Sequence, residues 1–302
     1  MVGGAHEDTP LSHGRPDAPG PSPRITVIIP TYNWSTVLPY SIGSVLRQTI
    51  SGWELLVVGD GCTDDSAAVV ARIADPRVRW INLPANTGHQ SGPNNEGLRQ
   101  ARGELIAYLG HDDLWLPHHL AVLVAALDAG AGLAYGITEM VGAAGGEVEP
   151  VPRELGPYRP NLWIPPSGVV HRRSALAAVG DWPDFRRVTV DPETHLWRRM
   201  AEAGTKFTAV ARLTAVKFPA ARRRDVYRRR PCHEQAAWFE RIGSEPDFEA
   251  VELGRMLGEA LSARTFLRRQ WSRVAMRLQR AVGYERGVLR RHRKFKGLEP
   301  LR

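Results

Sequence analysis

The chain of 302 residues contains only two cysteines, Cys62 and Cys232, and no pair of cysteines at zinc-ligand spacing. Two cysteines cannot build a disulfide framework, so we expect a reducing compartment. No apolar run approaches the length that a bilayer-spanning helix needs. The first strand-to-helix turn reads PTYNWS and lacks the GxGxxG fingerprint of dinucleotide-binding folds. These absences count against a disulfide-stabilised protein, a membrane-spanning protein and a nicotinamide-dependent oxidoreductase.

Positive charge is concentrated at one end of the chain. The net charge is +8, and the segment 261–302 holds eleven Arg and two Lys against two Glu. Within it, apolar residues recur at helical spacing over 266–282, with arginines between them, which predicts a basic amphipathic helix. Two interpretations stay open: the apolar stripe packs against the rest of the protein, or it lies on an anionic membrane surface. No recognition motif accompanies the arginines, so we expect no nucleic-acid partner.

Composition divides the chain into four parts. Residues 1–23 are rich in Pro, Gly and polar groups and lack a signal-peptide pattern, which predicts a disordered lead-in. We expect one main domain over 24–220, with halves at 24–117 and 118–220. An Arg-rich segment and a helix follow at 221–260, before the basic helical region 261–302.

Apolar runs and helical periodicities alternate in the first half of the chain. Strands are predicted at 24–30, 53–58, 77–83 and 104–109, and helices at 36–48, 65–73, 94–102 and 117–128. This alternation is typical of an α/β fold with a doubly wound, mostly parallel central sheet and helices on both faces. Beyond it, we predict extended segments at 132–141, 167–172 and 206–210, and helices at 193–203, 234–242 and from 251 onward.

Polar loops follow each of the four predicted strands. They lie at 31–33, 59–61, 86–88 and 110–113, and parallel strands bring such loops to one edge of the sheet, where ligands bind. The last loop holds adjacent carboxylates, Asp112 and Asp113, directly after a buried strand. Adjacent carboxylates are tolerated beside a cation, most simply a divalent metal that carries a phosphate. A solvated turn is the alternative for this pair taken alone.

Five segments give a more specific signal through their order and spacing. They are VIIPTYN, VVGDGCTDDS, NTGHQSGPNNEGLRQARGELIAYL, HDDLWLP and PETHLWRRMAEAG. Over residues 24–218 they resemble the family 2 glycosyltransferases, which have the GT-A fold and use nucleotide sugars. The resemblance implies an inverting enzyme of polysaccharide biosynthesis that moves a sugar from a nucleoside diphosphate to a hydroxyl of a glycan or lipid-linked intermediate. We expect a cytoplasmic protein, at the inner face of the plasma membrane if the tail binds lipid.

The resemblance also implies which residues bind the donor. Tyr32 can offer a ring face to the base, and Asp60 can accept a hydrogen bond from the base or the ribose; ordinary loop and turn roles are the alternatives. The residues expected to line the nucleotide-sugar pocket are Pro30, Thr31, Tyr32, Asn33, Asp60, Asn86, Gly88, Asn95 and His111.

A bound Mg²⁺ or Mn²⁺ is expected beside the diphosphate, because it neutralises the leaving group as a Lewis acid. By resemblance Asp112 contacts this metal and Asp113 supports it. The first acid of the family's DxD signature is Gly110 in this chain, which is a departure from the pattern. His233, in the Arg-rich segment, is a further expected metal ligand, and a solvated loop histidine is the alternative.

An inverting transfer needs a general base for the acceptor hydroxyl. Alignment on the Leu-Trp-x-Arg helix places Glu193 in this role, with Asp191 as the rival and Pro192 in place of the customary preceding acid. Both acids could instead serve only as helix-start residues. Because Gly110 and Pro192 replace family acids, a non-catalytic nucleotide-sugar or carbohydrate-binding module stays the alternative function.

Overall fold

The computed structural model describes residues 22–143, 148–160, 162–223 and 225–262. Nine strands form one sheet in the order β3-β2-β1-β4-β8-β6-β9-β5, with β7 paired to the outer part of β6. The strands are β1 (Ile25–Thr31), β2 (Trp53–Gly59), β3 (Val78–Asn82), β4 (Leu105–Tyr108), β5 (Leu114–Trp115), β6 (Leu133–Val141), β7 (Val148–Val151), β8 (Val169–Arg172) and β9 (Phe207–Lys217). The helices are α1 (Leu38–Leu46), α2 (Ser66–Ile73), α3 (Ser91–Gln100), α4 (His119–Asp128), α5 (Pro192–Glu202), α6 (Val226–Arg229), α7 (His233–Ser244) and α8 (Phe248–Leu261).

The first four strands are parallel, and the carboxyl ends of β1, β2 and β3 are level, while β4 ends opposite Ile28 of β1. Thr31 pairs with Gly59, and Gly59 pairs with Asn82 on the next strand. Every residue of β1, β2 and β4 is buried, which explains why these strands read as continuous apolar runs. The loops that leave these ends therefore gather at one edge of the sheet, which we call the rim: residues 31–35, 59–64, 83–89 and 109–113.

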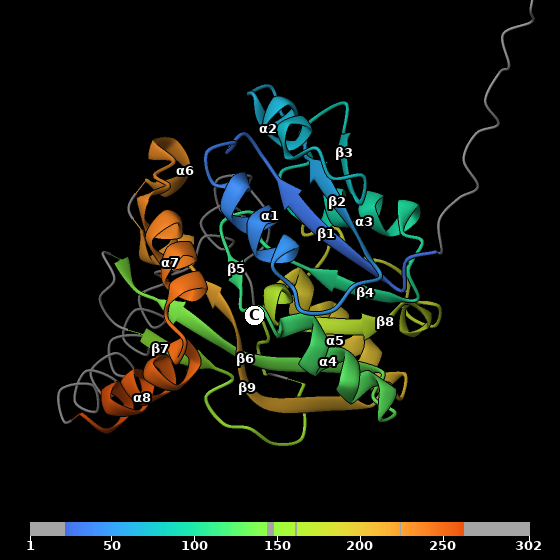
Figure 1. The fold of residues 1–302 in the computed structure, drawn as a ribbon. Coiled ribbons are helices and arrows are strands. Elements are labelled where there is room, and N and C mark those ends of the chain that lie inside the picture. The colour runs from blue at the N-terminus through green and yellow to red at the C-terminus, as the bar shows by residue number, and fades with distance from the viewer. Residues whose placement is uncertain (1–21, 144–147, 161, 224, 263–302) are drawn as a thin grey trace, which may run out of the picture.

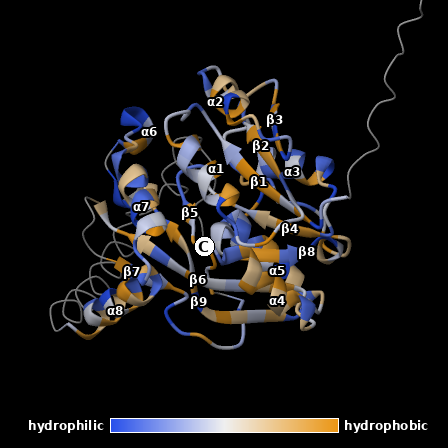
Figure 2. Ribbon diagram, in the orientation of Figure 1, coloured by the Kyte–Doolittle hydropathy of each residue, from blue (hydrophilic) through white to orange (hydrophobic). Residues whose placement is uncertain are grey.

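Helices cover both faces of the sheet (Figure 1). Alternate residues of β1 divide between two cores, with Ile25, Val27 and Ile29 on the side of α1, α2 and α4. Ile28 lies on the other side with residues of α3 and α5. Figure 2 shows hydrophobic stretches along β1 and β2 and mixed hydropathy along the helices. The expected doubly wound arrangement is confirmed.

The second half of the sheet mixes directions. Strand β8 runs antiparallel to β4 and β6, while the long strand β9 runs parallel to β6 with shifts in register. Parallel ladders still account for the larger share of the pairing. Helices α7 and α8 form a third core with β5 and the far end of β9, through residues such as Trp238, Phe248 and Phe218. These elements place the last part of the described chain beside the rim.

Most predicted elements are present with shifts of a few residues at their ends. The sequence did not predict β5, β7 or α6, which have two to four residues each and are too short to show a periodicity. The predicted basic helix at 266–282 lies outside the described residues. Among the helices of the described ranges, none has both the length and the apolarity needed to cross a bilayer.

Candidate functional site

Asp60 organises two of the rim loops. Its carboxylate is buried and accepts hydrogen bonds from the backbone N–H and hydroxyl of Thr87 at 2.9 and 2.8 Å, from Asn86 Nδ2 at 3.1 Å and from Gly88 N–H at 3.2 Å. Gly61 has φ +71°, and a Cβ on it would lie 2.5 Å from the Asn86 nitrogen, so this close approach of the two loops requires glycine. The structure thus brings the predicted residues Asp60, Asn86 and Gly88 together.

Asn33 holds the first rim loop to the second. It adopts a positive φ of 47°, and its Oδ1 accepts hydrogen bonds from the backbone N–H groups of Thr63 at 2.7 Å and Asp64 at 3.2 Å. Asp64 in turn accepts a bond from Ser35 N–H at 3.0 Å. Tyr32, the residue before Asn33, is 42% exposed. Its ring is therefore open to a ligand, while Asn33 fixes the loop that carries it.

An aromatic cluster lies where β1 and β4 end. Thr31 Oγ1 and His111 Nδ1 are 3.0 Å apart, and the His111 ring meets Trp34 edge-on with 5.3 Å between centroids. Trp34 also meets Tyr227 of α6 at 5.7 Å. Burial lowers the pKa of His111 to about 4, so this imidazole is neutral near pH 7. Helix α6 therefore reaches the rim beside the predicted residues Thr31 and His111.

Asp113 is fully buried and occupied by protein donors. Its Oδ2 accepts bonds from Lys217 Nζ at 2.7 Å and Ser167 Oγ at 2.5 Å, and its Oδ1 accepts one from Phe218 N–H at 3.2 Å. Burial alone would lower the pKa of Lys217, but the charges of Asp113 and Asp112 raise it above its ordinary value. The ion pair between Lys217 and Asp113 joins the 110–113 loop to β9.

Steric crowding accounts for the glycine at position 110, where the DxD signature of the family has its first acid. A Cβ there would lie 2.7 Å from Asp113 Oδ2 and 3.4 Å from Asp112 Oδ1. Its N–H donates to Ser167 Oγ at 3.0 Å, which holds the loop against the segment before β8. With Asp113 paired to Lys217, a side chain at position 110 has no room.

Asp112 is the second carboxylate of the loop, and its surroundings differ from those of Asp113. Burial and then the charge of Asp113 raise its pKa to about 7. Its carbonyl oxygen accepts a 3.4 Å bond from Gln235 Nε2, which brings the start of α7 to the loop. His233 is the exposed first residue of the same helix. The predicted ligands Asp112 and His233 are therefore on neighbouring elements.

The residues present fit a divalent cation that takes few ligands from the protein. No group of three or more His, Cys, Asp or Glu in the described ranges is arranged to hold a metal ion. Mg²⁺ in phosphate sites is usually held by one or two carboxylates together with substrate phosphates and waters. A carboxylate with a raised pKa, beside a second one already neutralised by Lys217, is consistent with that mode.

Glu193 and Asp191 lie at the start of α5. Asp191 is the N-cap residue and Glu193 is in the first turn, buried, with Trp163 Nε1 donating to its Oε1 at 3.0 Å. Burial and the charge of Asp191 raise the pKa of Glu193, while the Trp163 bond and the Lys217 charge oppose the rise. The Lys217 charge thus acts on Glu193 as well as on the carboxylates of the 110–113 loop.

Asn95 and Pro30 have less direct roles. Both ends of the Asn95 amide bond to the backbone of Trp182, at 3.0 and 2.9 Å, so this side chain fixes α3 to the segment before α5. Pro30 is buried within β1. Donor contacts by these two residues stay predictions.

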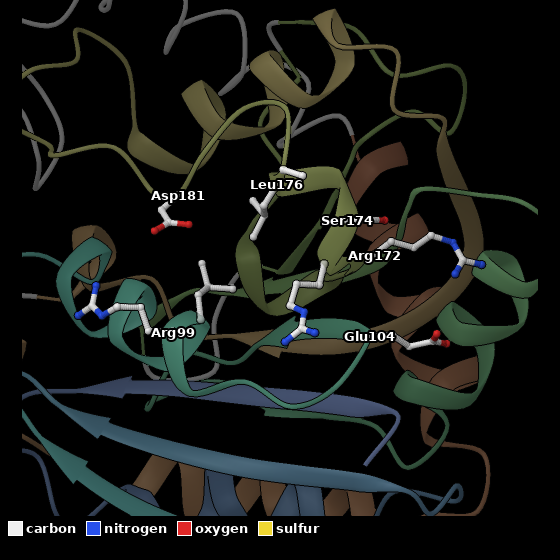
Figure 3. A pocket seen from close by; sticks show the side chains of 9 residues that line it. Arg99, Glu104, Arg172, Ser174, Leu176 and Asp181 are labelled. Carbon is white, nitrogen blue, oxygen red and sulfur yellow. The ribbon is translucent and has the colours of Figure 1, made fainter. Parts of the chain in front are cut away.

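A cavity of about 660 Å³ lies away from the rim (Figure 3). Its wall includes Arg99 at the end of α3, Glu104 before β4, and Arg173 and Asp181 after β8. Glu104 precedes β4 whereas Asp112 follows it, so the cavity and the 110–113 loop lie at opposite ends of that strand. The chemistry that the sequence predicts is not located in this cavity.

Several residues of the site were not predicted. Lys217, Ser167 and Trp163 each bond to a predicted carboxylate, from positions 104, 54 and 30 residues away along the chain. No local pattern links such distant positions. The indirect signal was the adjacent acid pair itself, because a buried Asp113 requires a cation or donors close by.

Comparisons with known proteins identify relatives. Residues 26–180 match the family described as Glycosyl transferase family 2. The chain is 34% identical over 100 residues to the Escherichia coli protein WfgD, a UDP-Glc:alpha-D-GlcNAc-diphosphoundecaprenol beta-1,3-glucosyltransferase. It is 32% identical over 119 residues to a GalNAc(5)-diNAcBac-PP-undecaprenol beta-1,3-glucosyltransferase of Campylobacter jejuni. The matches cover 33% and 38% of this chain and 39% and 38% of those relatives, so they span well under half of each protein.

Solved structures share the fold at lower identity. TarS 1–349 from S. aureus in complex with UDP is 18% identical with a TM-score of 0.57, over 78% of this chain and 77% of that one. The mannosyltransferase PcManGT from Pyrobaculum calidifontis, in complex with GDP-Man and Mn²⁺, is 18% identical with a TM-score of 0.54, over 84% and 81%. Both likenesses support the GT-A fold.

Proposed function

The chain belongs to the family 2 glycosyltransferases, and from that premise we propose an inverting, metal-assisted transfer from a nucleoside diphosphate sugar to a lipid-linked glycan. The observation that carries the proposal is that one short segment bonds to a carboxylate on each side: Trp163 to Glu193 of α5 and Ser167 to Asp113 of the 110–113 loop. The charge of Lys217, bonded to Asp113, also acts on Asp112 and Glu193. In this proposal a carboxylate for the diphosphate side and a base for the acceptor side belong to one site.

The rim loops bind the donor in this proposal. Tyr32 provides an exposed ring for the base, and the loop 86–88, fixed by Asp60, provides backbone groups beside it. Asp112 would hold the Mg²⁺ or Mn²⁺, and His233 would be a further ligand. When bound, this ion would neutralise negative charge on the departing diphosphate.

Glu193 takes the proton from the acceptor hydroxyl, and Asp191 is the rival for this role. A raised pKa makes a carboxylate a stronger base, and burial and the charge of Asp191 raise the pKa of Glu193. Attack by the deprotonated oxygen on the face opposite the diphosphate inverts the anomeric configuration. The Trp163 indole orients the carboxylate through its 3.0 Å hydrogen bond.

The relatives favour a lipid-linked acceptor. The two glucosyltransferases named above act on diphosphoundecaprenol-linked sugars, and such acceptors are held at a membrane surface. A basic segment, 261–302, would suit a protein that works beside anionic lipid. We therefore include a peripheral membrane contact, at the cytoplasmic face, in the proposal.

A donor panel tests the function. Purified protein is incubated with UDP-glucose, UDP-GlcNAc or GDP-mannose and a GlcNAc-diphospho-lipid, with and without Mn²⁺, and the released nucleotide is measured. We expect release with one donor, dependent on Mn²⁺ and faster with acceptor. Binding of a donor without turnover would favour the non-catalytic module. That alternative is motivated by Gly110 and Pro192, which replace acids of the family pattern.

A further inference from the structure

The short segment Trp163-Ile-Pro-Pro-Ser167 touches both halves of the site. We propose that residues 163–167 are a positioning element that sets Glu193 relative to the 110–113 loop, with Trp163 as the donor that orients the base. The inference rests on the proposed function, because it assigns a role to Trp163 through Glu193.

One end of the segment is fixed to α5. Trp163 Nε1 donates to Glu193 Oε1 at 3.0 Å, and one helical turn later Trp197 Nε1 donates to the carbonyl of Ile164 at 3.0 Å. Trp197 and Ile164 are fully buried. Two indoles, one from the segment and one from the helix, thus bind the same stretch of chain to the helix that carries the base.

The other end is fixed to the 110–113 loop. Ser167 Oγ donates to Asp113 Oδ2 at 2.5 Å and accepts from Gly110 N–H at 3.0 Å, and the Ser167 carbonyl accepts from Trp115 Nε1 at 2.6 Å. Ser167 is 1% exposed. A single residue therefore contacts the loop at both its ends and the strand that follows it.

Between these ends the chain has little freedom. Pro165 and Pro166 restrict their own φ angles, and Pro166 also restricts the residue before it. Four residue steps span at most about 14 Å, so the anchors at positions 163 and 167 cannot separate further. The segment thus limits the distance between the helix that carries the base and the loop that carries Asp112.

The environment of Glu193 makes the role of Trp163 measurable. The groups that act on this carboxylate are Asp191 on its own helix, Trp163 on the segment and Lys217 on β9. Asp191 raises the pKa of Glu193, whereas Trp163 and Lys217 lower it. Loss of the indole N–H therefore leaves a base that needs a higher pH to become ionised.

The first test is the variant Trp163→Phe, which keeps an aromatic ring and removes the N–H. We expect the acidic limb of the pH profile of kcat/KM, measured with the donor that the panel identifies, to move upward by about one pH unit. The rate should recover at high pH. Trp53→Phe, at the amino end of β2 where the ring lies beneath Arg77, makes the same substitution away from the site and should leave the limb in place.

The second test addresses the other end. Ser167→Ala removes the hydroxyl that donates a hydrogen bond to Asp113 and accepts one from Gly110, so the 110–113 loop loses its anchor. We therefore expect the Mn²⁺ concentration for half-maximal activity to rise roughly tenfold. The acidic limb should stay where it is in the wild type. Calorimetric titration with UDP and thermal melting confirm that each variant is folded and binds nucleotide.

The outcomes separate the inference from the function on which it rests. An unshifted limb in Trp163→Phe, or an unchanged Mn²⁺ requirement in Ser167→Ala, would overturn the positioning role while the transferase assignment stands. Full activity of Glu193→Gln would overturn the base assignment and the role of Trp163 with it. If Trp163→Phe does not fold, the Mn²⁺ requirement of Ser167→Ala decides the question.

Discussion

At the residue scale, the adjacent acids Asp112 and Asp113 have different tasks. Asp113 accepts three hydrogen bonds, one of them from the Lys217 ammonium, and forms part of the framework. Asp112 is buried with a pKa raised to about 7, so its ionised form is costly to the folded protein. A carboxylate whose ionised form destabilises the folded protein, and which lies beside a predicted substrate site, is better explained by a role in ligand binding than by a contribution to stability.

Asp112→Asn should separate activity from stability. The substitution removes the proposed metal ligand, and metal stabilisation of a leaving group is worth several kcal/mol, so we expect turnover to fall at least about a hundredfold. The melting temperature should stay equal or rise, because a neutral amide replaces a destabilised acid. Retention of wild-type turnover by a folded variant would contradict the assignment.

Lys217→Met should give a different result. It leaves Asp113 as a buried charge without its cation, and breaking a buried pair on one side costs about 3–5 kcal/mol. We expect the free energy of unfolding, measured by urea titration, to fall by an amount of that order. Arg24→Met removes an exposed cation at the start of β1 and serves as the control, with a change below about 1 kcal/mol. Equal stability of the two variants would refute the structural role of Lys217.

At the element scale, α8 packs against the sheet through the apolar residues Phe248 and Met256, and one of its acids, Glu252, lies next to a buried acid of β6. Glu139 of β6 is fully buried, and burial followed by the adjacent Glu252 of α8 raises its pKa to about 9. Arg241 and Arg255 both bond to the carboxylate of Glu252. The protonated form of Glu139 is therefore the one that suits the folded protein at neutral pH.

This arrangement predicts a pH dependence of stability with a definite sign. Because the folded pKa of Glu139 lies above its unfolded value, its contribution is fully present below pH 4.5 and declines as the pH rises through about 9. Glu139→Gln mimics the protonated acid, so the variant should melt higher than the wild type at pH 8–9 and similarly at pH 5. Melting curves at both pH values provide the measurement, and parallel curves would contradict the raised pKa.

The elements also show what sequence patterns can predict. The apolar runs that became β1, β2 and β4 and the periodic segment that became α4 were evident, because burial repeats along each of them. The two-residue strand β5 has no pattern of its own and forms only by pairing with β9. Asp112 and Glu193 could be predicted from motifs, whereas Trp163 and Ser167 could not, because tertiary packing alone brings them to the carboxylates.

At the scale of the whole molecule, the site joins two differently built halves of one sheet. The parallel half provides the rim loops after β1, β2 and β4, and the mixed half provides Lys217 from β9 and Glu193 from α5. Strand β8, antiparallel to β4, connects the halves. In the proposed function, donor binding therefore belongs mainly to the first half and the base to the second, as a two-substrate transfer requires.

The basic tail leads to a prediction about the whole protein. Deletion of residues 263–302 removes thirteen of the forty Lys and Arg residues together with only two acids, and it should abolish co-sedimentation with phosphatidylglycerol vesicles at low salt. Donor hydrolysis should persist, because the rim residues and Glu193 all lie before position 262. Unchanged co-sedimentation of the truncated protein would refute the membrane contact.

The most direct measurement of the central claim is the transfer rate of Glu193→Gln, set beside its donor affinity. The glutamine amide keeps the size of the Glu193 side chain but cannot take the proton from the hydroxyl of the acceptor substrate. We predict that transfer to the proposed lipid-linked acceptor falls by a factor of about 10²–10⁴, while calorimetry with Mn²⁺ and the donor that the panel identifies gives an affinity within roughly twofold of the wild type. Transfer at the wild-type rate, or loss of donor binding together with activity, would contradict the account.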